Sequence, residues 1–265
     1  APTARPGAAR RRASRAMTTP PPSRWLRNFH PAPTARVRLV CLPHAGGSAS
    51  YYFPMSTALS PEFEVYGVQY PGRQDRYAEP FVDSIDALAD QVFTQLAALP
   101  DKPTAVFGHS MGAVLAFEVA RRYETSAGRP VLTVFASGSR APSRYGDERE
   151  FMDDAALVGV MRELGGTDPR VLSDPELLST FLPAFRNDYR ALQAYHRGTD
   201  VGISAPIVVM TALDDPKTSD AAARAWHEHT TGGGDVHVFA GGHFFLEKQP
   251  QKVIEIVTQA LRAAG

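Results

Sequence analysis

The 265-residue sequence predicts an α/β domain with a mostly parallel central sheet and helices on both of its faces. Short apolar runs typical of buried strands alternate along the chain with segments whose apolar residues recur at helical spacing. Between residues 140 and 200 this alternation stops and only helical patterns remain. A Gly-x-Ser-x-Gly motif at residues 108–112 stands between an apolar run and a helical pattern.

The alternating part of the chain supplies both kinds of element. Residues 85–96 have helical spacing, with Asp83 or Ser84 available as the N-cap, and residues 111–123 and 221–229 follow the same pattern. A last helix is expected around residues 253–261. The expected strands are 37–42, 63–69, 103–107, 131–136, 206–211 and 236–239.

The insertion at about residues 140–200 contains two helical patterns, 153–164 and 175–196. Because it follows the strand after the motif helix, we interpret it as a helical lid over the site. Phe181, Phe185 and Tyr189 share one face of the second pattern at i+4 spacing. Such a stripe is more often core than ligand contact, but in a lid one face serves both purposes. These three residues are therefore candidates for lining a substrate chamber.

The N-terminal region differs in composition from the rest of the chain. Proline and alanine dominate residues 1–35, nine arginines precede the first acidic residue, Glu62, and little apolar surface is available to bury. We expect a disordered extension over residues 1–35 and a folded domain over residues 36–265. An organellar transit peptide is the alternative for this arginine-rich segment.

Composition also restricts the partners and the compartment. The formal net charge is zero, so no overall field favours nucleic acid or an anionic membrane. No run of about eighteen apolar residues exists, and the sequence therefore predicts no membrane span. The single cysteine, Cys41, excludes a disulfide within the chain and fits a reducing compartment. We expect a cytoplasmic monomer.

The motif makes Ser110 a candidate nucleophile because a strand, a sharp turn and a helix would expose its hydroxyl at the edge of the sheet. Flanking glycines remove the Cβ atoms that would clash in such a turn. A serine needs a base, usually histidine, and a carboxylate that orients the base. Among the eight histidines, His243 follows a strand and two glycines, where α/β sheets bind their ligands. It also gives the chain order Ser, Asp, His.

The acid is expected in the loop after strand 206–211, where Asp214 and Asp215 are adjacent and spacing alone barely separates them. Acyl transfer also needs N–H donors for the oxyanion. Met111, directly after the nucleophile, is one candidate donor. Ala45, in the glycine-containing loop after the first predicted strand, is the other. A phosphate-binding turn is the competing interpretation of that loop, but no Walker or dinucleotide pattern is present.

Several matched segments give the chain, from about residue 36 to the C-terminus, a resemblance to discrete type II thioesterases. These editing enzymes accompany polyketide and nonribosomal peptide synthases. The segments are Leu42-Pro-His-Ala-Gly-Gly-Ser48, Val68-Gln-Tyr-Pro-Gly-Arg73 with Arg76, Phe107-Gly-His-Ser-Met-Gly112, Ala225-Trp226 with His229-Thr-Thr231, and Gly241-Gly-His-Phe-Phe-Leu246.

The resemblance implies an α/β-hydrolase fold with Ser110 as nucleophile, His243 as base and Asp215, the aspartate before proline, as acid. It also implies Ala45 and Met111 as oxyanion donors. The expected substrate is an acyl thioester on an acyl or peptidyl carrier protein, and no metal or cofactor is expected because the phosphopantetheine belongs to the carrier. The alternatives are a small-molecule carboxylesterase with the same triad and a non-catalytic carrier-binding protein.

Overall fold

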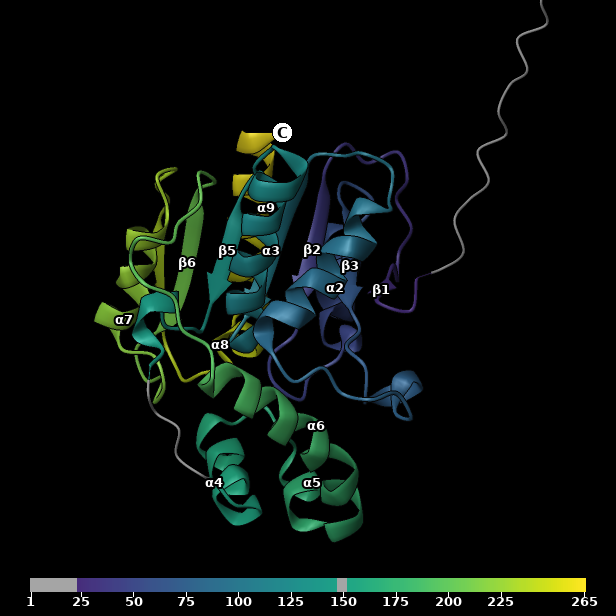
Figure 1. Ribbon diagram of the computed structural model, residues 1–265, viewed down its shortest axis with the longest axis vertical. Coiled ribbons are helices and arrows are strands. Elements are labelled where there is room, and N and C mark those ends of the chain that lie inside the picture. Colours follow the sequence, from purple (N-terminus) through teal and green to yellow (C-terminus); the bar gives the residue numbers. More distant parts are fainter. Residues whose placement is uncertain (1–22, 147–151) are drawn as a thin grey trace, which may run out of the picture.

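A seven-stranded sheet organises the computed structural model, which describes residues 23–146 and 152–265 (Figure 1). The strand order is β1-β3-β2-β4-β5-β6-β7, and every neighbouring pair is parallel except β1 with β3. The strands are β1 (Leu26–Arg27), β2 (Arg38–Leu42), β3 (Glu64–Val68), β4 (Thr104–His109), β5 (Val134–Ser137), β6 (Ile207–Ala212) and β7 (Val236–Phe239).

Helices cover both faces of this sheet, as the alternation in the sequence predicts. In the described residues the α-helices are α1 (Phe53–Leu59), α2 (Ile85–Ala97), α3 (Met111–Ala127), α4 (Asp154–Leu164), α5 (Pro169–Ser173), α6 (Pro175–Gln193), α7 (Asp220–Arg224), α8 (Phe245–Lys248) and α9 (Pro250–Ala264). Short 3-10 segments complete several of the connections.

The core forms two layers, one on each side of the sheet. In β2, Val40 and Leu42 pack with α2 and α3, whereas Leu39 and Cys41 pack with α1 and α9. All four side chains are fully buried, which explains why β2 is a continuous apolar run instead of an alternating one. Figure 1 shows α3 and α9 on opposite sides of the sheet.

Local capping signals define the ends of several helices. The Ser84 hydroxyl accepts a hydrogen bond from the backbone N–H of Ala87, so Ser84 rather than Asp83 caps α2. Asp153 caps α4 in the same way, through Ala156. At the C-terminal end of α3, Gly128 has a left-handed φ of 67°, which glycine adopts without steric cost.

The stretch between β5 and β6 contains the expected helical insertion. Its described part consists of α4, α5 and α6 with short connections and contributes no strand to the sheet. Figure 1 shows these three helices gathered at one end of the sheet. The predicted 175–196 pattern corresponds to α6, which continues through Pro183. The intervening helix α5 was not expected.

The expected disorder over residues 1–35 is wrong for residues 23–35. Leu26 and Arg27 form β1, which pairs antiparallel with the edge of β3. Trp25 is buried, and the Arg76 guanidinium lies 4.4 Å from the centre of its ring. These contacts bury apolar area and cover a strand edge, which the composition alone did not indicate. Residues 1–22, the rest of the predicted extension, lie outside the described part.

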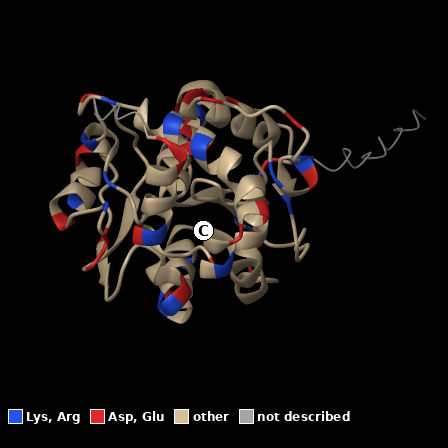
Figure 2. Ribbon diagram, turned by 90° about the horizontal axis from the view of Figure 1, so that it is seen from below, with Lys and Arg blue, Asp and Glu red and all other residues tan. Residues whose placement is uncertain are grey.

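Charged residues of both signs are interspersed over the molecule. Figure 2 shows basic and acidic segments side by side on many helices and loops, as ion pairs such as Arg262–Glu62 and Arg224–Asp220 illustrate. Among the described residues, no helix combines the length and the apolar character that crossing a membrane requires.

Candidate active site

The turn between β4 and α3 holds Ser110 in a strained conformation. Ser110 has φ 55° and ψ −121°, a region that non-glycine residues rarely occupy. Its backbone N–H donates to the carbonyl of Ser137 at 2.8 Å, which ties the turn to β5. A Cβ on Gly108 would lie 1.9 Å from the Gly112 oxygen, and one on Gly112 would lie 1.9 Å from the Leu42 oxygen. Close backbone approach therefore requires both motif glycines.

His243 and Asp215 form a buried pair next to this turn. The Nδ1 atom of His243 lies 2.8 Å from Oδ2 of Asp215, and the other carboxylate oxygen accepts the backbone N–H of Lys217 at 2.9 Å. Since a carboxylate faces Nδ1, that nitrogen carries the proton and Nε2 is left as an acceptor. Nε2 is buried with no hydrogen-bond partner among the described residues. Asp214 is exposed, so the structure distinguishes the two adjacent aspartates.

Ser110 and His243 open onto one cavity at the end of the sheet, beneath the helical insertion. The residues predicted for the site that line this cavity are Ser110, His243, Ala45, Phe181, Phe185 and Tyr189. The rings of Phe185 and Tyr189 stack with their centres 5.6 Å apart. Phe185 is buried, whereas Phe181 and Tyr189 are half-buried. The three aromatic residues of α6 therefore both pack with the core and face the space above the serine.

The two expected oxyanion donors come from different elements. Ala45 lies in a tight turn that the backbone N–H of Gly47 closes by donating to the His44 carbonyl at 2.9 Å. Met111 begins α3 directly after Ser110 and is fully buried; its side chain is not part of the cavity wall. Backbone N–H groups in the first turn of a helix lack intrahelical acceptors and carry the positive end of the helix dipole. Ala45 lines the same cavity as Ser110, and the Met111 peptide directly follows Ser110 at the start of α3.

Two further histidines, His44 and His109, lie close to His243, and the sequence did not predict their role. Burial, together with the nearby His243 and Arg73, lowers the pKa of His44 to about 3. Burial and the neighbouring His243 and His44 also hold the pKa of His109 well below its usual value. The centres of the His109 and His243 rings lie 5.0 Å apart. The His44 and His109 rings are therefore both neutral at pH 7, and His109 packs an uncharged ring against His243.

Sequence reasoning also missed Asp188, a fully buried carboxylate on α6. It pairs with Arg73, whose Nη1 atom lies 2.5 Å from Oδ2 and whose Nη2 atom lies 3.0 Å from Oδ1. The same Oδ2 accepts the backbone N–H of Gly46 at 2.8 Å. Arg73 belongs to a segment of the family resemblance, but its partner lies 115 residues away, and spacing gives no signal for such a contact.

No group of three or more His, Cys, Asp or Glu side chains in the described part of the chain is arranged to hold a metal ion. The polar groups at the cavity are instead a hydroxyl, an imidazole with its carboxylate, and backbone N–H groups. This set suits acyl transfer through a serine ester.

Comparison with known proteins identifies the family, because the thioesterase domain family matches residues 37–261. The chain belongs to this family. It is 48% identical over 240 residues to the probable cadicidin biosynthesis thioesterase of Streptomyces griseus, covering 90% of this chain and 66% of that protein. It is 43% identical to thioesterase PikA5 of Streptomyces venezuelae, covering 89% of this chain and 85% of the relative.

Solved structures agree with this assignment. The type II thioesterase BorB from the borrelidin biosynthetic cluster superimposes with a TM-score of 0.82 at 46% identity, covering 89% of the thioesterase described here and 97% of BorB. RedJ, a thioesterase of prodiginine biosynthesis in Streptomyces coelicolor, gives a TM-score of 0.80 at 32% identity, with 91% of each chain covered. The predicted fold class and the resemblance to type II thioesterases are confirmed.

Proposed function

We propose that this thioesterase hydrolyses acyl thioesters on the phosphopantetheine arm of acyl or peptidyl carrier proteins, and so removes stalled or mis-primed units during polyketide or nonribosomal peptide biosynthesis. The observation that carries the proposal is the buried His243–Asp215 pair, because Nε2 of His243 has no hydrogen-bond partner among the described residues and His243 lines the same cavity as the strained Ser110. Relatives named for cadicidin and gramicidin S biosynthesis support this pathway context.

In the proposed first step the Ser110 oxygen attacks the thioester carbonyl carbon while Nε2 of His243 takes the hydroxyl proton. The carbonyl oxygen becomes an oxyanion, which the N–H groups of Ala45 and Met111 stabilise. Asp215 keeps the proton of the imidazole on Nδ1 and stabilises the imidazolium that forms. No step requires a metal or a cofactor of the enzyme, since the pantetheine arm arrives with the substrate.

The tetrahedral intermediate then collapses, the carbon–sulfur bond breaks, and the pantetheine sulfur leaves with the proton held on His243. The acyl group remains as an ester on Ser110. His243 next removes a proton from water, the resulting hydroxide attacks the ester carbonyl, and the free acid leaves as Ser110 regains its proton. In this proposal Phe181, Phe185 and Tyr189 contact the acyl chain from the lid.

The direct test compares one acyl group presented in two forms, as a carrier-protein or pantetheine thioester and as a simple alkyl oxygen ester. We expect a higher kcat/KM for the thioesters, and a loss of at least about 10⁴-fold in kcat for Ser110→Ala. A marked preference for the alkyl ester would indicate a carboxylesterase. Failure of a fluorophosphonate to label Ser110 would indicate a binding protein without catalytic activity.

A further inference from the structure

Asp188 connects the lid to the loop that carries one of the proposed oxyanion donors. Asp188 lies on α6, and only 1% of its side chain is exposed. Among the described residues, Asp188 has two contacts with Arg73, one with the Gly46 N–H, and a longer one of 3.4 Å from the Asn187 side-chain amide. The carboxylate oxygens therefore accept hydrogen bonds mainly from one arginine and one backbone N–H.

Three hydrogen bonds fix successive peptide units of this loop. The peptide that contains the Ala45 N–H also contains the His44 carbonyl, which accepts from Gly47. The next peptide is held by the bond from the Gly46 N–H to Asp188. Farther along, the carbonyl of Gly47 accepts from Arg73 at 3.2 Å. Gly46 has φ 73°, and Phe181 lies 3.0 Å from where its Cβ would be, so the lid also packs directly on the loop.

We propose that Asp188 is a positioning residue that aims the Ala45 N–H at the oxyanion, so that the oxyanion hole is complete only while α6 is docked. This inference rests on the proposed function of Ser110 and Ala45. Asp188 and Arg73 are both buried, and separating them would leave two charges without partners away from water. The loop and α6 consequently move together, and hydrolysis is restricted to the state in which the lid covers the substrate.

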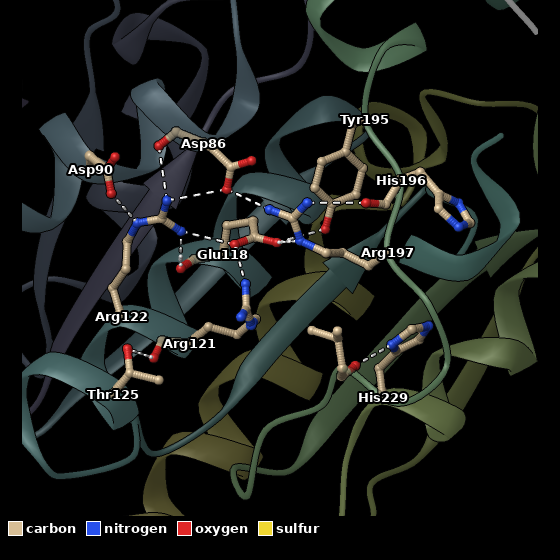
Figure 3. Close-up of polar contacts among 11 residues, drawn as sticks. Asp86, Asp90, Glu118, Arg121, Arg122, Thr125, Tyr195, His196, Arg197 and His229 are labelled. Atoms are coloured by element: carbon tan, nitrogen blue, oxygen red, sulfur yellow. Dashed lines mark hydrogen bonds and ion pairs between the residues drawn. The ribbon is translucent and has the colours of Figure 1, made fainter. Parts of the chain in front are cut away.

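A second buried carboxylate provides a matched control. Glu118, on α3, is fully buried and contacts Arg121, Arg122, Arg197 and the hydroxyl of Tyr195 (Figure 3). Tyr195 and Arg197 directly follow α6, so this network also attaches the insertion to the rest of the molecule. Within the described part of the chain, the Glu118 side chain makes no hydrogen bond or ion pair with the loop around Ala45.

The experiment compares Asp188→Asn with Glu118→Gln, two isosteric changes that each remove one buried negative charge. The amide in Asp188→Asn has one acceptor oxygen instead of two, so it cannot accept from Gly46 and from both Nη atoms of Arg73 as the carboxylate does, and it leaves the buried guanidinium without a counter-charge. We expect its kcat on an acyl-pantetheine thioester to fall about 100-fold, with KM within about threefold. The reason is that a misplaced Ala45 N–H stabilises the oxyanion of the transition state less well, while substrate binding is little changed. Glu118→Gln should lower Tm while keeping kcat within about twofold.

The decisive readout is the affinity for a trifluoromethyl ketone analogue of the thioester, measured against the corresponding alcohol. The Ser110 oxygen adds to the ketone carbon, its proton passes to His243, and the former carbonyl oxygen becomes an oxyanion. Asp188→Asn should weaken ketone binding by a factor similar to its loss in kcat and leave alcohol binding unchanged. A purely structural role would lower the folded fraction without changing this ratio.

Arg73→Lys is the second variant and decides the question if Asp188→Asn does not fold. It keeps the charge but loses the planar fork that reaches both Asp188 and the Gly47 carbonyl. We expect a fall of about 10-fold in kcat with the same loss of ketone affinity. Unchanged ketone affinity in the folded variants, or an equal loss in Glu118→Gln, would overturn the inference. A wild-type protein that hydrolyses no thioester would instead reject the proposed function.

Discussion

Asp188 and Glu118 are both fully buried carboxylates that bind arginines and attach the helical insertion to the body of the molecule. They differ in what else they hold. Glu118 joins side chains, and its arginine partners retain 14–29% side-chain exposure. Asp188 binds one arginine that is only 7% exposed, together with a backbone N–H next to Ala45. The two carboxylates are therefore alike in burial and charge, but only Asp188 of the two accepts a backbone N–H among the described residues.

The comparison predicts the largest difference when an arginine is removed from each network. Arg73→Ala leaves the Asp188 carboxylate buried without a cation, and we expect the free energy of unfolding to fall by about 3–5 kcal/mol. Arg197→Ala should cost only about 1 kcal/mol, because Glu118 keeps Arg121 and Arg122 and the Arg197 side chain is itself partly exposed to solvent. Urea denaturation of both variants measures the two values. Equal losses would show that the two networks have the same energetic character.

A second effect, smaller for each pH unit, concerns acid sensitivity and follows from the desolvated histidines beside the site. The pKa of His44 is about 3 in the folded protein and 6.5 in the unfolded chain, so between these values the unfolded chain binds more protons. The stability that depends on neutral His44 is complete above pH 6.5 and is lost as the pH falls. We expect a contribution of about 1.4 kcal/mol per pH unit within this window.

His44→Phe preserves an aromatic ring against Tyr51 and Phe244, with which the His44 ring packs at 4.6 and 4.9 Å between centres. Its stability should decline less steeply below pH 6.5 than that of the wild type, as measured by denaturation at several pH values. An unaltered pH slope in His44→Phe would show that this ring does not contribute to acid sensitivity.

Hydrophobic periodicity accounts for how much of the fold the sequence predicts. The strands β2 to β7 and the helices α2, α3, α4, α6 and α9 follow from it, and β7 matches its expected bounds. The missed elements α1, α5 and α8 span 7, 5 and 4 residues, too few to display a helical period. The strand β1 has two residues and forms only because β3 presents an edge.

The site residues likewise fall into those that the sequence predicts and those that depend on tertiary packing. Ser110, His243 and the two aspartates each follow a predicted strand, so their convergence at the carboxyl ends of a parallel sheet is predictable. In the sequence, only the family resemblance favours Asp215 over Asp214. The structure distinguishes them directly, since Asp215 is buried against His243 and Asp214 is exposed. Asp188 reads in the sequence as one acidic residue on an amphipathic helix. Its burial depends on tertiary packing against Arg73, which no local pattern encodes.

The most direct test of the central claim is mass spectrometry of the protein quenched during turnover of an acyl-carrier thioester. The proposed mechanism predicts a transient acyl ester on the peptide that contains Ser110, and no such ester in Ser110→Ala. In His243→Gln that has been acylated chemically, the ester should persist longer, because the base that activates water for deacylation is missing. An acyl group found on another residue, or thioester hydrolysis that Ser110→Ala retains, would contradict the assigned nucleophile.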